Sequence, residues 1–147
     1  AYGEGWAVYG EILSQDMGLY ADDPLGRIGF LQAMLFRAAR LVADTGMHRY
    51  HWSREDAIVY LAETTGQSRE AMAQEVDRYA VWPGQAAAYW VGAKRMLDLR
   101  TRAQMVLGDD FSLREFHEVV LSGGPRPLAL LEDDVERWYI AKLNADH

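Results

Sequence analysis

Apolar residues recur three and four positions apart along almost the whole chain, which is the spacing of one face of an α-helix. No segment alternates between apolar and polar residues with a period of two, so the sequence predicts no β-sheet. Start and stop signals divide the pattern into about seven helices. The expected helices cover residues 2–17, 24–45, 53–66, 68–79, 85–107, 112–123 and 128–144.

Capping residues locate several helix starts. Asp23 precedes Pro24, which suits an N-cap followed by a proline in the first turn. The Ser-Arg-Glu-Asp segment that begins at Ser53 is similar to a capping box, and Ser112 with Glu115 predicts a full one. Glycines are expected to end helices at five places: Gly18, Gly46, Gly66, Gly108 and Gly123.

The connections between the expected helices are short, which favours antiparallel neighbours in a bundle. Hydrophobic residues make up 50% of the 147 residues, so the chain can build a core. We therefore predict an all-α fold of about seven helices, packed as an antiparallel bundle in a single domain over residues 1–147.

The composition excludes some functions. Asp and Glu number 22 against 15 Lys and Arg, and the formal net charge of −7 argues against a nucleic-acid binder. The absence of cysteine excludes disulfides and thiolate metal sites. No apolar run reaches the roughly 20 residues of a membrane span. The first residues read as helix and not as a signal peptide, so we expect the chain to begin inside a longer protein.

Two of the four histidines have the spacing of metal ligands. His48 and His51 are three apart, and Asp44 lies four residues before His48, so these three side chains could form a metal site. The expected helix end at Gly46 would break their common face, and a loop with a hydrogen-bonded histidine is the other interpretation. The chain contains neither a Glu-x-x-His nor a His-Glu-x-x-His motif.

Carboxylates on the first and second expected helices are further candidates. Glu4 and Glu11 are two helical turns apart, and such a pair can bind a cation, do acid–base work, or remain solvated or paired with arginine. On the second helix, Arg40 and Asp44 have the i,i+4 spacing of an ion pair, which favours a structural role.

A proline–glycine break precedes the expected helix at 85–107. Pro83 and Gly84 fix the first turn of that helix, so Tyr89 would project from a well-defined position one turn in. A tyrosine hydroxyl is a suitable neutral donor to a developing oxyanion. A core tyrosine with its hydroxyl at the rim is the alternative interpretation.

Several segments of the chain resemble one protein family in the same order. The first, Tyr-Gly-Glu-Gly-Trp-Ala at residues 2–7 with Tyr9 and Glu11, is similar to the Y-x-E-G-W-A-x-Y-x-E segment of the bacterial domain-of-unknown-function 885 family. Four later blocks, covering residues 37–48, 52–61, 83–92 and 116–132, also resemble that family. The resemblance covers essentially the whole chain.

This resemblance implies a helical zinc-peptidase-like fold of which the chain is the C-terminal portion. Full-length members resemble zinc oligopeptidases and carboxypeptidases and carry a His-Glu-x-x-Pro-Gly-His segment that would lie before Ala1. By resemblance, Glu4 is the third zinc ligand, Tyr89 polarises the scissile carbonyl, and His48 binds substrate or the oxyanion. His117, Arg95 and Gln85 are candidate substrate-binding residues, and helix packing is the other role considered for His117.

The resulting hypothesis is that the longer protein is a zinc-dependent peptidase, while this chain alone holds no zinc and is inactive. A non-enzymatic helical module that binds a peptide or partner protein is the alternative. A third possibility is a truncated product that folds only as an oligomer. We expect association, either as a homo-oligomer or by docking to the missing N-terminal part, because the face that would pack against that part is uncovered. The sequence leaves open a cytoplasmic or periplasmic location.

Overall fold

The computed structural model describes residues 1–145 and confirms the all-α fold. Within those residues there are seven α-helices and one short 3₁₀ helix, and no β-strand. The helices are α1 (Tyr2–Asp16), α2 (Pro24–Tyr50), α3 (Arg54–Thr65), α4 (Arg69–Val81), α5 (Gln85–Leu107), η1 (Gly108–Asp110), α6 (Leu113–Ser122) and α7 (Leu128–Ala145). None of the helices in this part of the chain is long and apolar enough to cross a bilayer.

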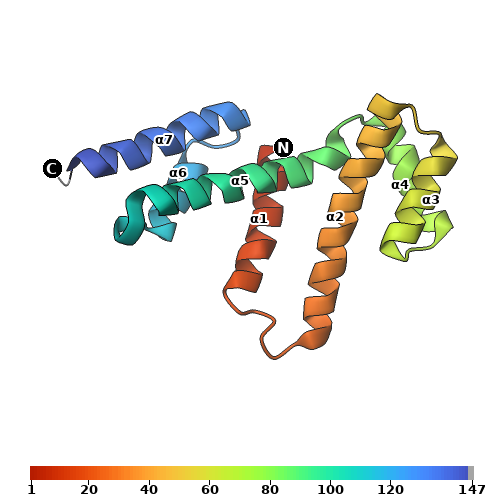
Figure 1. The fold of residues 1–147 in the computed structure, drawn as a ribbon. Helices are drawn as coiled ribbons and strands as arrows, with labels where there is room; N and C mark the ends of the chain where they lie inside the picture. The colour runs from red at the N-terminus through yellow and green to blue at the C-terminus, as the bar shows by residue number, and fades with distance from the viewer. Residues whose placement is uncertain (146–147) are drawn as a thin grey trace.

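Helix α5 packs against three other helices, α1, α2 and α7. Helix α1 crosses α5, and α2 packs against α5 closer to its amino end (Figure 1). Helices α1 and α2 run in opposite directions and are joined by a loop at the bottom of this view. Helices α3 and α4 pack on each other and on α2, while α6 and α7 pack together at the other end of α5.

Most of the buried hydrophobic side chains within residues 1–145 fall into two separate clusters. The first joins α1, α5, α6 and α7 around Tyr9, Met96, Phe116 and Leu131. The second joins α2, α3, α4 and the start of α5, and includes Tyr79. Helix α5 contributes to both clusters, so it connects the two halves of the structure.

Local capping explains most of the helix starts. The Asp23 side chain accepts a hydrogen bond from the Gly26 amide at 2.9 Å, and Ser53 forms a capping box with Asp56, as the sequence predicts. The capping box predicted at Ser112 is only half present. Ser112 accepts from the Glu115 amide, but the Glu115 carboxylate pairs instead with Lys142 of α7 at 2.6 Å.

The prediction that Gly46 ends a helix is wrong. Helix α2 continues to Tyr50, and His51 takes the left-handed conformation at its end, with φ 58°. Gly46 lies inside the helix because the indole ring of Trp52 folds back over it. A Cβ atom at this position would lie 2.5 Å from that ring, so the glycine is required for packing.

Helices α1 and α5 cross at two glycines. A Cβ atom on Gly5 would lie 2.4 Å from the Gly92 backbone, and one on Gly92 would lie 2.1 Å from the Ala1 carbonyl oxygen. Only residues without side chains allow backbones to approach this closely. The crossing sets Glu4, next to Gly5, beside the amino-terminal turns of α5.

Candidate functional site

Three of the candidate residues meet at the crossing of α1 and α5. The Gln85 Nε2 group donates to Glu4 Oε1 and to the Tyr89 hydroxyl oxygen, each at 3.3 Å. Gln85 and Tyr89 are i,i+4 neighbours on α5, so their side chains share one face. The Gln85 amide therefore connects the candidate metal ligand to the candidate oxyanion donor.

Arg40 of α2 completes this polar chain from the opposite side. Its Nη2 group donates to Gln85 Oε1 at 3.4 Å, and the residue is only 5% exposed. The guanidinium carbon lies 4.7 Å from the centre of the Tyr89 ring, which is a cation–π arrangement. Two further rings, those of Phe36 and Tyr79, lie 5.4 and 5.5 Å from the same carbon.

Glu75 of α4 supplies the negative charge nearest to Arg40. Its Oε2 atom lies 3.8 Å from Arg40 Nε, which is an ion pair but too long for a hydrogen bond. The buried Nε–H group of Arg40 therefore has no hydrogen-bond partner among residues 1–145. The same oxygen accepts from the Tyr79 hydroxyl at 3.0 Å and from Arg78 at 2.7 Å. Burial raises the pKa of Tyr79, so this hydroxyl remains protonated as the donor.

Asp44 holds the amino end of α5. Its two carboxylate oxygens lie 3.1 and 3.0 Å from the Gly84 amide nitrogen and accept from it, and Asp44 is only 2% exposed. Gly84 has φ 81° and cannot provide a side-chain cap, so the cap comes from α2. The predicted Arg40–Asp44 ion pair is therefore wrong. Although the spacing suits a pair, each side chain has a partner across the helix interface.

His48 lies one turn beyond Asp44 on the same face of α2. Its Nε2 atom is 3.0 Å from the Tyr79 carbonyl oxygen and 3.6 Å from Asp44 Oδ1. Gly46 does not separate Asp44 from His48, contrary to the sequence prediction, because α2 is continuous through all three residues. His51 stands at the helix end, however, and the described residues contain no group of three or more side chains placed to hold a metal ion.

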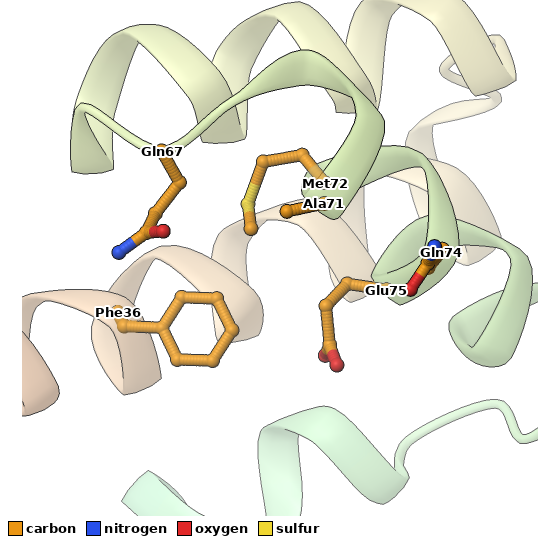
Figure 2. Close-up of a pocket in the computed structure, with 6 residues that line it drawn as sticks. All are labelled: Phe36, Gln67, Ala71, Met72, Gln74 and Glu75. Carbon is orange, nitrogen blue, oxygen red and sulfur yellow. The ribbon is translucent and has the colours of Figure 1, made fainter.

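A cavity of about 320 Å³ lies between α2 and α4 (Figure 2), and Glu75, the ion-pair partner of Arg40, is one of its lining residues. Figure 2 shows the Phe36 ring beside the Glu75 carboxylate, with the Met72 side chain above them. The lining residues are Phe36, Gln67, Ala71, Met72, Gln74 and Glu75. Three of these six residues are apolar. The only carboxylate among them, that of Glu75, is already paired with Arg40, Arg78 and Tyr79.

His117 lies in the other half of the structure. Its Nε2 atom is 2.7 Å from the Tyr9 hydroxyl, and the Trp6 indole meets the imidazole edge-on at 5.4 Å between centres. Burial, and then the positive charge of Arg100, lower the pKa of His117, while burial raises the pKa of Tyr9. Within residues 1–145, His117 thus contacts aromatic side chains of α1 and has no hydrogen bond to Glu4, Gln85 or Arg40.

The remaining candidates have ion-pair partners on neighbouring helices. Arg95 pairs with Glu132 of α7 at 3.1 Å, and Glu11 pairs with Arg37 of α2 at 2.7 Å. Glu4 differs from Glu11, because no Lys, Arg or His within residues 1–145 lies at ion-pair distance from it. Of the two candidate carboxylates on α1, Glu4 is therefore the one left for another role.

Sequence reasoning overlooked Arg40 as part of the site. The available signal was the position of Arg40 and Asp44 beside Ala39 and Ala43, on a face that is otherwise apolar. Charged residues on a buried helix face are costly unless they are paired, so they indicate a specific partner. Glu75 could not have been found in this way, because its helix has many charged residues.

Comparison with known proteins places this geometry in a family. The chain resembles the crystal structure of the putative lipoprotein from Colwellia psychrerythraea, with 48% sequence identity and a TM-score of 0.92. The match covers 95% of this chain and 24% of that one, so the chain spans about a quarter of the length of that relative. None of the curated proteins matches the sequence significantly. The family model described as bacterial protein of unknown function (DUF885) matches residues 1–135, and the chain belongs to that family.

Proposed function

We propose that this region forms part of a zinc-dependent peptide-hydrolysing site in a longer protein, and that Glu4 supplies one of the ligands. The observation that carries the proposal is the state of the Glu4 carboxylate. It is partly exposed, has no ion-pair partner among the described residues, and is held by Gln85 through Oε1 alone. Oε2 is therefore left for a cation.

The donor chemistry suits zinc but is incomplete. A carboxylate oxygen is an accepted zinc ligand, and a hydrogen bond from an outer partner such as Gln85 is the usual way to orient it. A catalytic zinc needs three protein ligands, and Glu4 is one. The other two would come from residues outside this chain. When bound there, zinc would supply Lewis-acid polarisation of the peptide carbonyl.

In this proposal, Tyr89 acts as a hydrogen-bond donor to the substrate. Its oxygen accepts from Gln85, so its own proton is available for a carbonyl oxygen that becomes negative. The ring is held by the Arg40 guanidinium, which limits its movement. His48 is the less direct candidate, because its Nε2 is already engaged with the Tyr79 carbonyl.

The test uses the longer protein that contains this region. Glu4→Ala should remove bound zinc, as measured by elemental analysis, and Glu11→Ala should retain it because Glu11 is paired with Arg37. Tyr89→Phe should retain zinc and lower peptide turnover by about 10²–10³-fold, the usual cost of losing one oxyanion donor. Zinc and activity both unchanged in Glu4→Ala would refute the proposal.

The chain of 147 residues should neither bind zinc stoichiometrically nor hydrolyse peptides, because one carboxylate is too few ligands. Isothermal titration with zinc measures this directly. One-to-one binding that is retained in Glu4→Ala and lost in His48→Ala would favour the site at Asp44, His48 and His51 instead.

A second candidate function is a helical module that binds a partner protein. It is favoured by a strip of exposed apolar side chains along α2, which includes Ile28, Leu31 and Leu35. The two functions differ in their dependence on Glu4. Binding through the α2 strip should be unaffected by Glu4→Ala, whereas the metal site should be lost.

A further inference from the structure

We infer that Arg40 is a positioning residue that fixes the orientation of the Gln85 amide and, through it, the hydrogen-bonding state of both Glu4 and Tyr89. The inference rests on the proposed function for its catalytic meaning, but the geometry stands independently of it. The inference follows from which atoms of Arg40, Gln85 and Glu4 can donate a hydrogen bond and which can accept one.

The side-chain amide of glutamine has an accepting end and a donating end, and the two are similar in shape. Gln85 presents Oε1 to Arg40 and Nε2 to Glu4 and Tyr89. A guanidinium can only donate. If the amide were reversed, its NH₂ group would face the Arg40 donors, and its oxygen would face the Glu4 carboxylate. Both contacts would be repulsive, so Arg40 selects one orientation.

The selected orientation decides what the two candidate groups can do. With Nε2 facing Tyr89, the phenol oxygen accepts and its proton remains for substrate. With the amide reversed, that proton would be donated to Gln85 Oε1 and lost to substrate. The same choice leaves Glu4 Oε1 hydrogen-bonded and Oε2 unoccupied by any described residue.

Arg40 is itself held in place, which a positioning residue requires. Its guanidinium lies against the rings of Phe36, Tyr79 and Tyr89, with Glu75 near Nε. Lysine has a single ammonium group and would lose the planar contacts with these rings and the directed donation to Gln85. The role therefore depends on the shape of the guanidinium as well as its charge.

The test is nuclear magnetic resonance of the ¹⁵N-labelled 147-residue chain, observing the Gln85 side-chain NH₂ signals, assigned by their loss in Gln85→Met. Glu4→Ala should shift these signals in the wild-type background. In an Arg40→Lys or Arg40→Met background the same substitution should cause a smaller shift, which is the signature of coupling in a double-mutant cycle. Arg37→Met, one turn earlier on α2, should leave the effect of Glu4→Ala unchanged.

An equal Glu4→Ala shift with and without Arg40 would overturn the inference. Circular dichroism establishes that each variant is folded. If neither Arg40 variant folds, the test is hydrogen exchange in the wild-type chain. The hydrogen-bonded NH₂ protons of Gln85 should exchange more slowly than those of the exposed Gln67 side chain. Equal exchange rates would overturn the inference.

In the longer protein, Arg40→Lys should lower kcat, leave KM near its original value and retain zinc, a pattern that loss of folding alone does not produce. If Glu4→Ala retains zinc but the isolated chain shows coupling to Arg40, the proposed function is refuted and the role of Arg40 in orienting Gln85 is supported. If Glu4→Ala loses zinc but the isolated chain shows no coupling to Arg40, only the role of Arg40 is refuted.

Discussion

The Asp44 carboxylate caps the amino end of α5 by accepting the Gly84 amide with both oxygens, at 3.1 and 3.0 Å. Asp44 belongs to α2, so the cap is a contact between helices and not a local one. The negative charge also lies where the α5 dipole favours it. Through this contact α2 fixes the turn of α5 that carries Gln85 and Tyr89.

Removing that cap should destabilise the protein. Asp44→Ala removes the acceptor of the Gly84 amide at the start of α5 and should lower the free energy of unfolding by about 0.5–2 kcal/mol, the usual cost of losing a helix cap. Asp44→Asn retains one acceptor oxygen and should recover part of the loss. Urea denaturation measures both, with Asp98→Ala as a control, since its exposed pair with Lys94 contributes only about 0–0.5 kcal/mol. Equal stability of wild type and Asp44→Ala would mean that water replaces the cap.

The glycine crossing of α1 and α5 should not tolerate a methyl group. Gly92→Ala places a Cβ against the Ala1 carbonyl and the Gly5 Cα, and such overpacking costs about 1–3 kcal/mol. Gly10→Ala is the matched control on α1. A Cβ there meets nothing within 4 Å, so it should raise stability by up to about 1 kcal/mol through helix propensity. The two variants should move the thermal midpoint in opposite directions, and a shift of the same sign would contradict the crossing.

His117 should make stability depend on pH. Because burial and Arg100 lower its pKa from 6.5, the folded state favours the neutral ring. The unfolded chain then binds the proton more readily, so this contribution is complete above about pH 6.5 and is lost as the pH falls through the lowered folded pKa. His117→Gln should flatten the fall in thermal midpoint between about pH 7 and 5. An unchanged slope would place the dependence on other groups.

The exposed strip on α2 should promote association. Leu25, Ile28, Leu31 and Leu35 are all more than 40% exposed and recur at helical spacing. We expect a dimer or larger oligomer by light scattering, reduced to monomer by Ile28→Asp with Leu35→Asp. A monomer at high concentration in the wild type would count against this expectation, and Val81→Asp is a control on another exposed apolar position.

Local signals in the sequence were sufficient for most of the helices. Asp23, Ser53 and Ser68 each accept a backbone amide three residues on, which depends only on neighbouring residues. Gly46 was misinterpreted because its role depends on the Trp52 ring that folds back from beyond the helix end. A glycine required for packing and a glycine that ends a helix are identical in sequence.

The candidate site was predicted in part. Glu4, Gln85 and Tyr89 were singled out from the sequence, and the structure brings them together. Arg40 was assigned to Asp44 by spacing, and that was wrong because both side chains reach across to α4 and α5. Partners on other helices are decided by the tertiary packing, which one-dimensional spacing does not describe.

The two hydrophobic clusters have a consequence for how the molecule opens. We expect each cluster to lose its packing as a separate cooperative unit, because α5 is the only helix within residues 1–145 that contributes buried side chains to both. Glu4 belongs to the half built on α1, and Arg40 belongs to the half built on α2. The hydrogen bonds of Gln85 therefore connect the two units. Partial unfolding of either unit would disconnect them before the remaining unit unfolds.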